Sequence, residues 1–252
     1  DLARAYRAWG RAFVRDPENE EARGHADRLA AKLGAWDEHV RNYEAAFERA
    51  ADAMLRSALL TTIARLHDER RGDPRAAIAA YERLVAHDAN DPAPLDALES
   101  LHTMVGDWAG LAGVLERKVT LAYDVEERGE LLRRVGSVQE GFLGDAEAAI
   151  GAYARAARDN DTDEAAFEAL DRLYVGLERF EPLREVLARR VELAGDRADR
   201  VGLGLRLGAL CEQQLRDPER AIEAYRRVLD DDAASVTATT ALGGLFERSG
   251  KW

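Results

Sequence analysis

Apolar residues recur along the chain at the spacing of one helix face. Ile78, Tyr81, Leu84 and Val85 fall at positions i, i+3, i+6 and i+7. Similar stripes follow, including one that contains Met104 and one that ends at Phe142. Helix-ending or helix-starting pairs such as Asp91-Pro92 and Gly106-Asp107 separate them. No segment shows sustained strand alternation or an Asn-Gly hairpin. The pattern predicts an all-α chain of about fourteen helices joined by short turns.

The chain repeats its sequence pattern every 72 residues. The phrase Ala-Ile-x-Ala-Tyr begins at Ala77, Ala149 and Ala221. Two further sets of residues, each 72 apart and here called columns, keep their character from copy to copy. One is leucine, at Leu29, Leu101, Leu173 and Leu245, and the other is aromatic, at Trp36, Trp108, Phe180 and Trp252. We expect one array of three and a half copies, 1–72, 73–144, 145–216 and 217–252, because stacked repeats share a continuous core. Neither end shows a polar capping face, so we also expect a fragment of a longer protein.

Each full copy holds two predicted helical hairpins, the second about four residues longer than the first. Val135-Gly136 and the run from Gly144-Asp145 to Tyr153 carry a resemblance to the tetratricopeptide repeat (TPR) family. The longer hairpins exceed the usual unit of that family, and the proline after the closing aspartate survives only in Asp16-Pro17. The resemblance implies a right-handed α-solenoid of stacked antiparallel hairpins. It also implies that the first helix of each hairpin lines a concave, peptide-binding surface.

Charge and composition narrow the choice of partners. The 252 residues include 36 basic and 48 acidic side chains, a net charge of −12, which disfavours nucleic-acid binding. No apolar run approaches the roughly 20 residues that span a bilayer, so we expect no membrane insertion. The low lysine count, against abundant arginine and alanine, suggests a bacterial source. We expect a cytoplasmic location, with the periplasm left open.

Catalytic and metal-binding patterns are missing from the sequence. The five histidines do not stand at ligand spacing. The acidic run from Asp159 has Glu164 and Leu170 where a calcium loop needs glycine and glutamate, so we interpret it as a corner that caps the next helix. Cys211, the Trp36 column, and the glycines at 202, 204 and 208 are interpreted as packing residues. We therefore expect a chain that is not an enzyme and uses no cofactor or metal.

The resemblance places a mostly basic column on the inner surface. Its members are Arg28, Lys32, Arg65, Ser100, Arg133, Ser137 and Arg172. Basic groups there favour an acidic peptide or chain terminus; alternatively, the arginines pair with acids of adjacent helices. The predicted function is a non-catalytic scaffold that binds a protein or peptide. The alternative is a regulatory or assembly segment of a larger enzyme or multidomain protein. A third option, repeat-based RNA recognition, is disfavoured by the charge.

Overall fold

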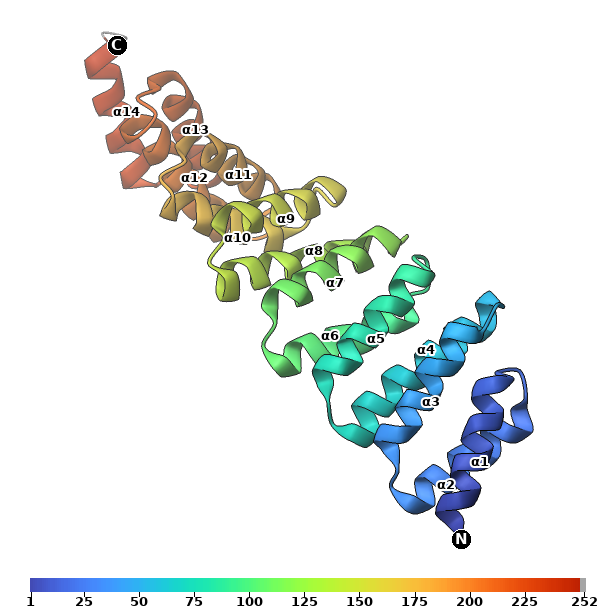
Figure 1. Ribbon diagram of the computed structural model, residues 1–252. Coiled ribbons are helices and arrows are strands. Elements are labelled where there is room, and N and C mark those ends of the chain that lie inside the picture. Colours follow the sequence, from blue (N-terminus) through green and yellow to red (C-terminus); the bar gives the residue numbers. More distant parts are fainter. Residues whose placement is uncertain (250–252) are drawn as a thin grey trace. The chain divides into compact units, whose positions relative to one another are not determined.

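The computed structural model describes residues 1–249, which form fourteen α-helices and two short π-helical segments and contain no strand (Figure 1). Trp252, the last member of the aromatic column, lies outside the described residues. The chain divides into two compact units, Asp1–Leu121 and Ala122–Trp252. The prediction of an all-α chain with about fourteen helices is confirmed. That all copies form a single array stays a prediction.

The first unit contains α1 (Leu2–Arg15), α2 (Glu20–Leu33), α3 (Trp36–Arg49), α4 (Ala53–Arg65), η1 (Leu66–Arg71), α5 (Pro74–His87), α6 (Ala93–Val105) and α7 (Trp108–Leu121). The second contains α8 (Val125–Val138), η2 (Gln139–Leu143), α9 (Ala146–Asp159), α10 (Glu164–Gly176), α11 (Phe180–Leu193), α12 (Arg197–Gln213), α13 (Pro218–Asp231) and α14 (Val236–Ser249). Within each unit, helices that follow one another pack together across short turns. Each unit therefore has the stacked-hairpin fold of TPR-like proteins.

Aspartates at equivalent positions of the four copies begin α1, α5, α9 and α13. The Oδ1 atoms of Asp73, Asp145 and Asp217 each accept a backbone N–H three residues later, at 2.9–3.1 Å. Asp1 does the same at the start of α1. Such caps satisfy N–H groups that have no partner inside the helix. Asp163 caps α10 in the same way, which confirms the interpretation of the acidic run beside it as a capping corner.

The longer hairpins end their first helices with a wider turn. η1 and η2 are π-helical, and the N–H groups of Asp73 and Asp145 each donate to a carbonyl six residues back, at 2.9 Å. Asp217 N–H reaches Cys211 in the same way after α12. A π turn holds more residues than an α turn. This turn accommodates part of the extra length of alternate hairpins.

Small residues let the helices approach closely in the core. A Cβ added at Gly208 would lie 2.5 Å from the ring of Tyr225, and one at Gly204 would lie 2.7 Å from Val228. The packing role predicted for these glycines is confirmed, as is the burial of Cys211, which is 1% exposed. The same prediction is wrong for Gly202, which is exposed with nothing within 4 Å of an added Cβ.

Two residues of the predicted apolar stripes lie at the surface instead. Met104 is 69% exposed and Phe142 is 56% exposed. Phe142 lies in η2, where the wider turn departs from the 3.6-residue period on which the stripe was extrapolated. Met104 lies in the last turn of α6, next to the left-handed cap at Gly106. The apolar stripes thus predict buried residues correctly within the α-helices and incorrectly at the helix ends.

Candidate functional site

The seven residues of the predicted inner-surface column all lie on even-numbered helices, and we call them the even-helix column: Arg28, Lys32, Arg65, Ser100, Arg133, Ser137 and Arg172. Four belong to the first unit and three to the second. All except Arg133, which is half-buried, are exposed. Even-numbered helices thus present most of these polar groups to solvent, as expected for a binding surface.

The first-unit members make only local contacts. Arg28 Nη2 lies 3.2 Å from His25 Nδ1, and Arg65 Nε lies 3.0 Å from Glu69 Oε1. The pairing with Glu69 raises the pKa of Arg65. Ser100 Oγ donates to the carbonyl of Asp96 at 3.1 Å. These contacts stay within one helix or its π-helical extension, so they do not tie the side chains to neighbouring hairpins.

The second-unit arginines are held by acids of other elements. Arg133 of α8 pairs with Asp163, the cap of α10, which is 6% exposed. Arg172 of α10 donates to both carboxylate oxygens of Glu140 in η2, at 2.7 and 3.2 Å. Both arginines therefore have an acidic partner within the chain. Their role in binding, like that of Ser137, stays a prediction.

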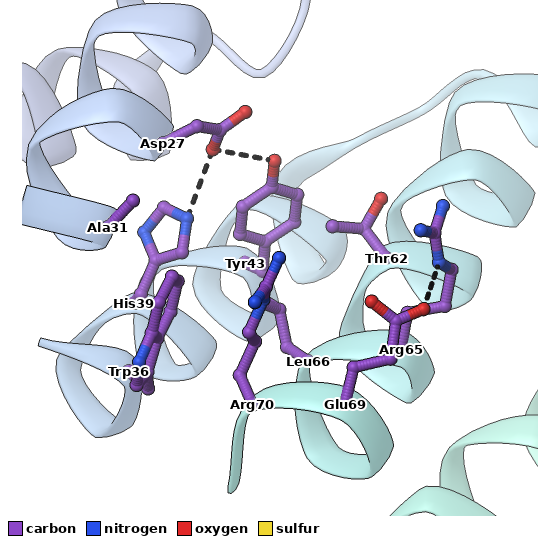
Figure 2. A pocket seen from close by; sticks show the side chains of 10 residues that line it. All are labelled: Asp27, Ala31, Trp36, His39, Tyr43, Thr62, Arg65, Leu66, Glu69 and Arg70. Carbon is purple, nitrogen blue, oxygen red and sulfur yellow. Dashed lines mark hydrogen bonds and ion pairs between the residues drawn. The ribbon is translucent and has the colours of Figure 1, made fainter. Parts of the chain in front are cut away.

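A pocket of about 270 Å³ lies among α2, α3, α4 and η1 of the first unit (Figure 2). Of the even-helix column, it contains Arg65. Its lining is Asp27, Ala31, Trp36, His39, Tyr43, Thr62, Arg65, Leu66, Glu69 and Arg70. Arg28 and Lys32 directly follow two of these residues on α2. The pocket therefore joins aromatic walls to charged groups beside the predicted column.

One carboxylate oxygen organises the inner end of the pocket. Asp27 Oδ1 accepts the hydroxyl proton of Tyr43 at 2.9 Å and lies 3.0 Å from His39 Nε2 (Figure 2). Because an ionised carboxylate only accepts hydrogen bonds, Nε2 carries the proton of the second contact. Burial first, and then the negative charge of Asp27, raise the pKa of Tyr43, so the phenol remains a donor.

Two acceptor atoms in this arrangement have no partner within residues 1–249. His39 is 2% exposed, and its Nδ1 is buried without a hydrogen bond. Asp27 Oδ2 also has no hydrogen bond to another described residue, and the Asp27 side chain is 44% exposed. Of these two atoms only Asp27 Oδ2 is accessible, so the pocket offers a carboxylate acceptor, which suits a ligand rich in donors.

Two arginines line the pocket opposite this carboxylate. The guanidinium of Arg70 lies over the ring of Trp36, with its Cζ 5.4 Å from the ring centroid. Arg65 is paired with Glu69, as described above. The charges of Asp27 and Glu69 thus balance those of Arg65 and Arg70. The interpretation of Trp36 as a packing residue is supported by its contacts with the buried core, although its ring also forms part of the pocket.

Sequence reasoning missed Asp27, His39 and Tyr43. The available signal was a departure of the first copy from the other two full copies. The two positions equivalent to His39 hold Leu111 and Leu183, and those equivalent to Tyr43 are also leucines. Polar residues in an otherwise apolar column mark a place where one copy differs from the others.

No protein-family model matches the chain, and no curated protein matches it in sequence. Its fold is similar to one chain of the solved structure of Naa15/Naa10 bound to HypK-THB, with 13% identity, a TM-score of 0.52, and coverage of 98% of this chain and 36% of the other. This chain thus spans about a third of that longer one.

Two further solved structures are TPR proteins by description. YrrB, described as having an unusual peptide-binding site, is 16% identical, with a TM-score of 0.39 and coverage of 79% of this chain and 96% of that one. A tetratricopeptide repeat protein from Parabacteroides merdae is 14% identical, with a TM-score of 0.37 and coverage of 98% and 93%. At these identities the likeness concerns the fold alone.

Membrane-spanning helices and clusters of metal-binding side chains are both absent from the described residues. No helix in residues 1–249 combines the length and apolarity that crossing a bilayer requires. In the same range, no group of three or more histidine, cysteine, aspartate or glutamate side chains is placed to hold a metal ion. We take the pocket beside Asp27 as the candidate site, because it combines aromatic walls with charged groups and an accessible carboxylate oxygen.

Proposed function

We propose that this chain is a non-catalytic scaffold that binds a peptide or partner protein on its even-numbered helices. The observation that carries the proposal is the pocket among α2, α3 and α4, with the exposed side chains of Arg28 and Lys32 beside it. A pocket with aromatic walls and a polar rim is a common anchor for a side chain of a binding partner.

The chemistry of the pocket supports binding over catalysis. Of its titratable groups, His39 Nε2 and Tyr43 Oη are both directed at Asp27. The hydroxyl of Thr62 donates to the carbonyl of Ala58 at 2.9 Å. No serine or cysteine lines the pocket to act as a nucleophile.

The predicted acidic character of the partner becomes part of this proposal. Arg28 and Lys32 are exposed on α2 and can contact carboxylates of a bound chain. A net charge of −12 disfavours a long polyanion such as nucleic acid, whereas a few carboxylates of a peptide can be met locally by Arg28 and Lys32, so we propose a protein partner.

The test is an affinity pull-down from the source lysate with wild type and two charge-matched variants. The first is Arg28/Arg65/Arg133/Arg172→Glu, on even-numbered helices. The control is Arg11/Arg41/Arg158/Arg227→Glu, on odd-numbered helices. We expect a partner that wild type and the control capture and the first variant loses, with all three chains folded by circular dichroism. Equal capture by all three would refute binding on the even-numbered helices.

The second candidate is a regulatory or assembly segment of a larger protein. Its support is that the similar Naa15/Naa10 complex contains a chain of which this one spans 36%. Mass analysis of the native gene product decides between the two. A chain of 252 residues would refute the segment, and a longer chain with a catalytic domain would support it.

A further inference from the structure

The repeat places a carboxylate at the same position of three even-numbered helices. Asp27, Glu99 and Asp171 occupy equivalent positions of successive copies and lie on α2, α6 and α10. A fourth equivalent, Gly243, has no side chain. The partners of these three carboxylates differ from copy to copy.

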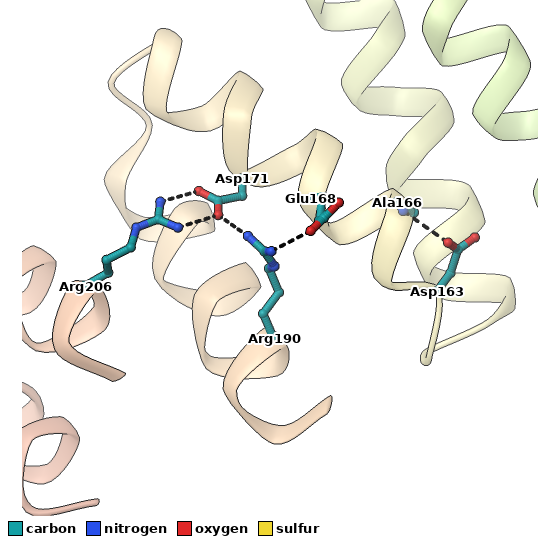
Figure 3. Close-up of polar contacts among 6 residues, drawn as sticks. All are labelled: Asp163, Ala166, Glu168, Asp171, Arg190 and Arg206. Atoms are coloured by element: carbon teal, nitrogen blue, oxygen red, sulfur yellow. Dashed lines mark hydrogen bonds and ion pairs between the residues drawn. The ribbon is translucent and has the colours of Figure 1, made fainter. Parts of the chain in front are cut away.

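In the second and third copies a cation from the next helix neutralises the carboxylate. Lys118 Nζ of α7 lies 2.5 Å from Glu99 and 2.6 Å from Asp96. At the equivalent position of α11, Arg190 pairs with Asp171 and, at 2.9 Å, with Glu168 (Figure 3). Two copies thus share one internal ion-pair arrangement.

Asp171 also binds a second cation, from the next even-numbered helix. Arg206 of α12 donates to both carboxylate oxygens, at 2.8 and 3.0 Å (Figure 3). Asp171 is 4% exposed, so its negative charge is buried among guanidinium groups. Such a two-point pair is characteristic of arginine, because the planar guanidinium matches the two carboxylate oxygens.

In the first copy both cation positions hold short, uncharged residues. Ala46 stands where Lys118 and Arg190 stand, and Thr62 stands where Arg206 stands. Asp27 therefore receives only the donors of His39 and Tyr43, both on Oδ1. The pocket is lined by Asp27 and by Thr62. It thus lies between the carboxylate and the position from which an arginine reaches it in the third copy.

We propose that this pocket binds an arginine side chain of a partner protein, whose guanidinium takes at Asp27 the place that Arg206 takes at Asp171. The inference rests on the proposed function and specifies one contact within it. A guanidinium has only donors, and the accessible Asp27 Oδ2, which has no hydrogen bond within residues 1–249, is an acceptor. Lysine is a poorer fit, because it offers a point charge without the planar two-point geometry.

The other charges of the pocket permit this occupant. Glu69 neutralises Arg65, and the guanidinium of Arg70 is placed over Trp36 rather than on Asp27. The opposite occupant, a partner carboxylate on Arg65 and Arg70, is the competing outcome of the test. Such a carboxylate would make no contact with Asp27 or His39.

The first test uses small probes and the whole chain. N-acetyl-arginine methylamide, its neutral citrulline analogue and N-acetyl-glutamate methylamide are titrated while the indole N–H signal of Trp36 is followed by NMR. We expect saturable millimolar binding of the arginine probe alone, at least about tenfold weaker in Asp27→Asn. Binding of the glutamate probe instead, or equal binding of the citrulline probe, would overturn the proposal.

The second test supplies the missing arginine from the chain itself. Thr62→Arg is expected to fill the pocket, abolish binding of the arginine probe and raise the folding equilibrium constant about fivefold, but not in the Asp27→Asn background. Thr61→Arg is the matched control, because Thr61 is adjacent on α4 and does not line the pocket. Equal effects of Thr62→Arg with and without Asp27 would overturn the proposal.

Failure of this inference and failure of the proposed function give different results. A partner captured equally by wild type and Asp27→Asn, with no binding of the arginine probe, would overturn the inference and leave the scaffold function standing. Binding of the arginine probe with no captured partner would overturn the proposed function, and with it the assignment of the guanidinium to a protein.

Discussion

Asp171 of α10 accepts two hydrogen bonds from Arg206 of α12, although the two helices are separated in the chain by α11. Arg190 of α11 pairs with the same carboxylate. One buried acid therefore connects three successive helices of the second unit (Figure 3). Because both cations depend on it, this carboxylate should contribute more to stability than a surface ion pair.

Replacing Asp171 by alanine should destabilise the chain by about 3 kcal/mol, because the largely buried Arg190 loses its buried partner and keeps only the more exposed Glu168. Asp171→Glu should reduce the free energy of unfolding far less, since a glutamate, Glu99, occupies the equivalent position of the second copy. Urea unfolding followed by circular dichroism measures both. Glu223→Ala, which removes an exposed pair with Arg227, is the control and should change stability by no more than about 0.5 kcal/mol. Equal losses at Asp171 and Glu223 would contradict the expected difference.

Glu178 occupies a backbone conformation that glycine adopts in the two preceding copies. Its φ is 53°, and the equivalent positions of the two preceding copies hold Gly106 and Gly34, at 69° and 64°. An L-residue with a side chain is disfavoured in this left-handed region. Glu178→Gly should therefore stabilise the chain by about 1 kcal/mol. Gly34→Ala should destabilise it by a similar amount, and a Glu178→Gly variant less stable than wild type would refute the argument.

Gly208 and Gly202 lie on the same helix but should respond oppositely to alanine. The new methyl group at Gly208 would enter the ring of Tyr225, which should cost about 1–3 kcal/mol. Gly202 is exposed, so alanine there should stabilise α12 by up to about 1 kcal/mol. Thermal unfolding of the two single variants, compared with wild type, tests the contrast. A stabilising Gly208→Ala would show that the tyrosine moves aside without loss.

His67 should make the chain less stable in mild acid. Burial, with a smaller contribution from Arg71, lowers its pKa below the ordinary value of about 6.5. Arg71 Nη1 lies 2.8 Å from His67 Nδ1, a contact that requires an unprotonated ring nitrogen. As the pH falls below about 6.5, His67 becomes protonated in the unfolded chain, whereas in the folded chain it stays neutral until the pH is lower. The free energy of unfolding therefore decreases.

The matched variant is His67→Gln, because Gln139 holds the equivalent position in the next copy. The free energy of unfolding of wild type should fall more steeply than that of the variant from pH 7 to pH 5. Parallel pH profiles for the two proteins would contradict a role for His67.

The sequence predicted helices and hairpins well because the signals for them are local and repeated. The capping aspartates at 73, 145 and 217 and the glycines at 34 and 106 act on the residues next to them. The wide turns before Asp73 and Asp145 were not predicted, since a carbonyl accepting from six residues ahead leaves no distinct residue pattern.

The candidate site was only partly predictable. Arg65 was named, and it does line the pocket. Its neighbours Asp27 and His39 come from different helices, and only the packing of α2 on α3 brings their side chains within 3.0 Å. Likewise, the pairing of Arg133 with Asp163 joins residues 30 apart in the chain. Contacts of this kind depend on the geometry between helices, which the spacing of residues within one helix does not specify.

The π-helical ends of α4 and α8 bear on how such an array can be lengthened or shortened. A left-handed residue follows the first helix of every hairpin, but in alternate hairpins the next N–H reaches a carbonyl six residues back, and in the hairpins between them one five residues back. The smallest module that can be duplicated without placing unlike turns next to each other is therefore the pair of hairpins. A designed array made by joining copies of residues 145–216, which lie within one unit, would preserve the junctions between successive helices seen there. One made by joining single hairpins would bring together ends that do not meet in this chain.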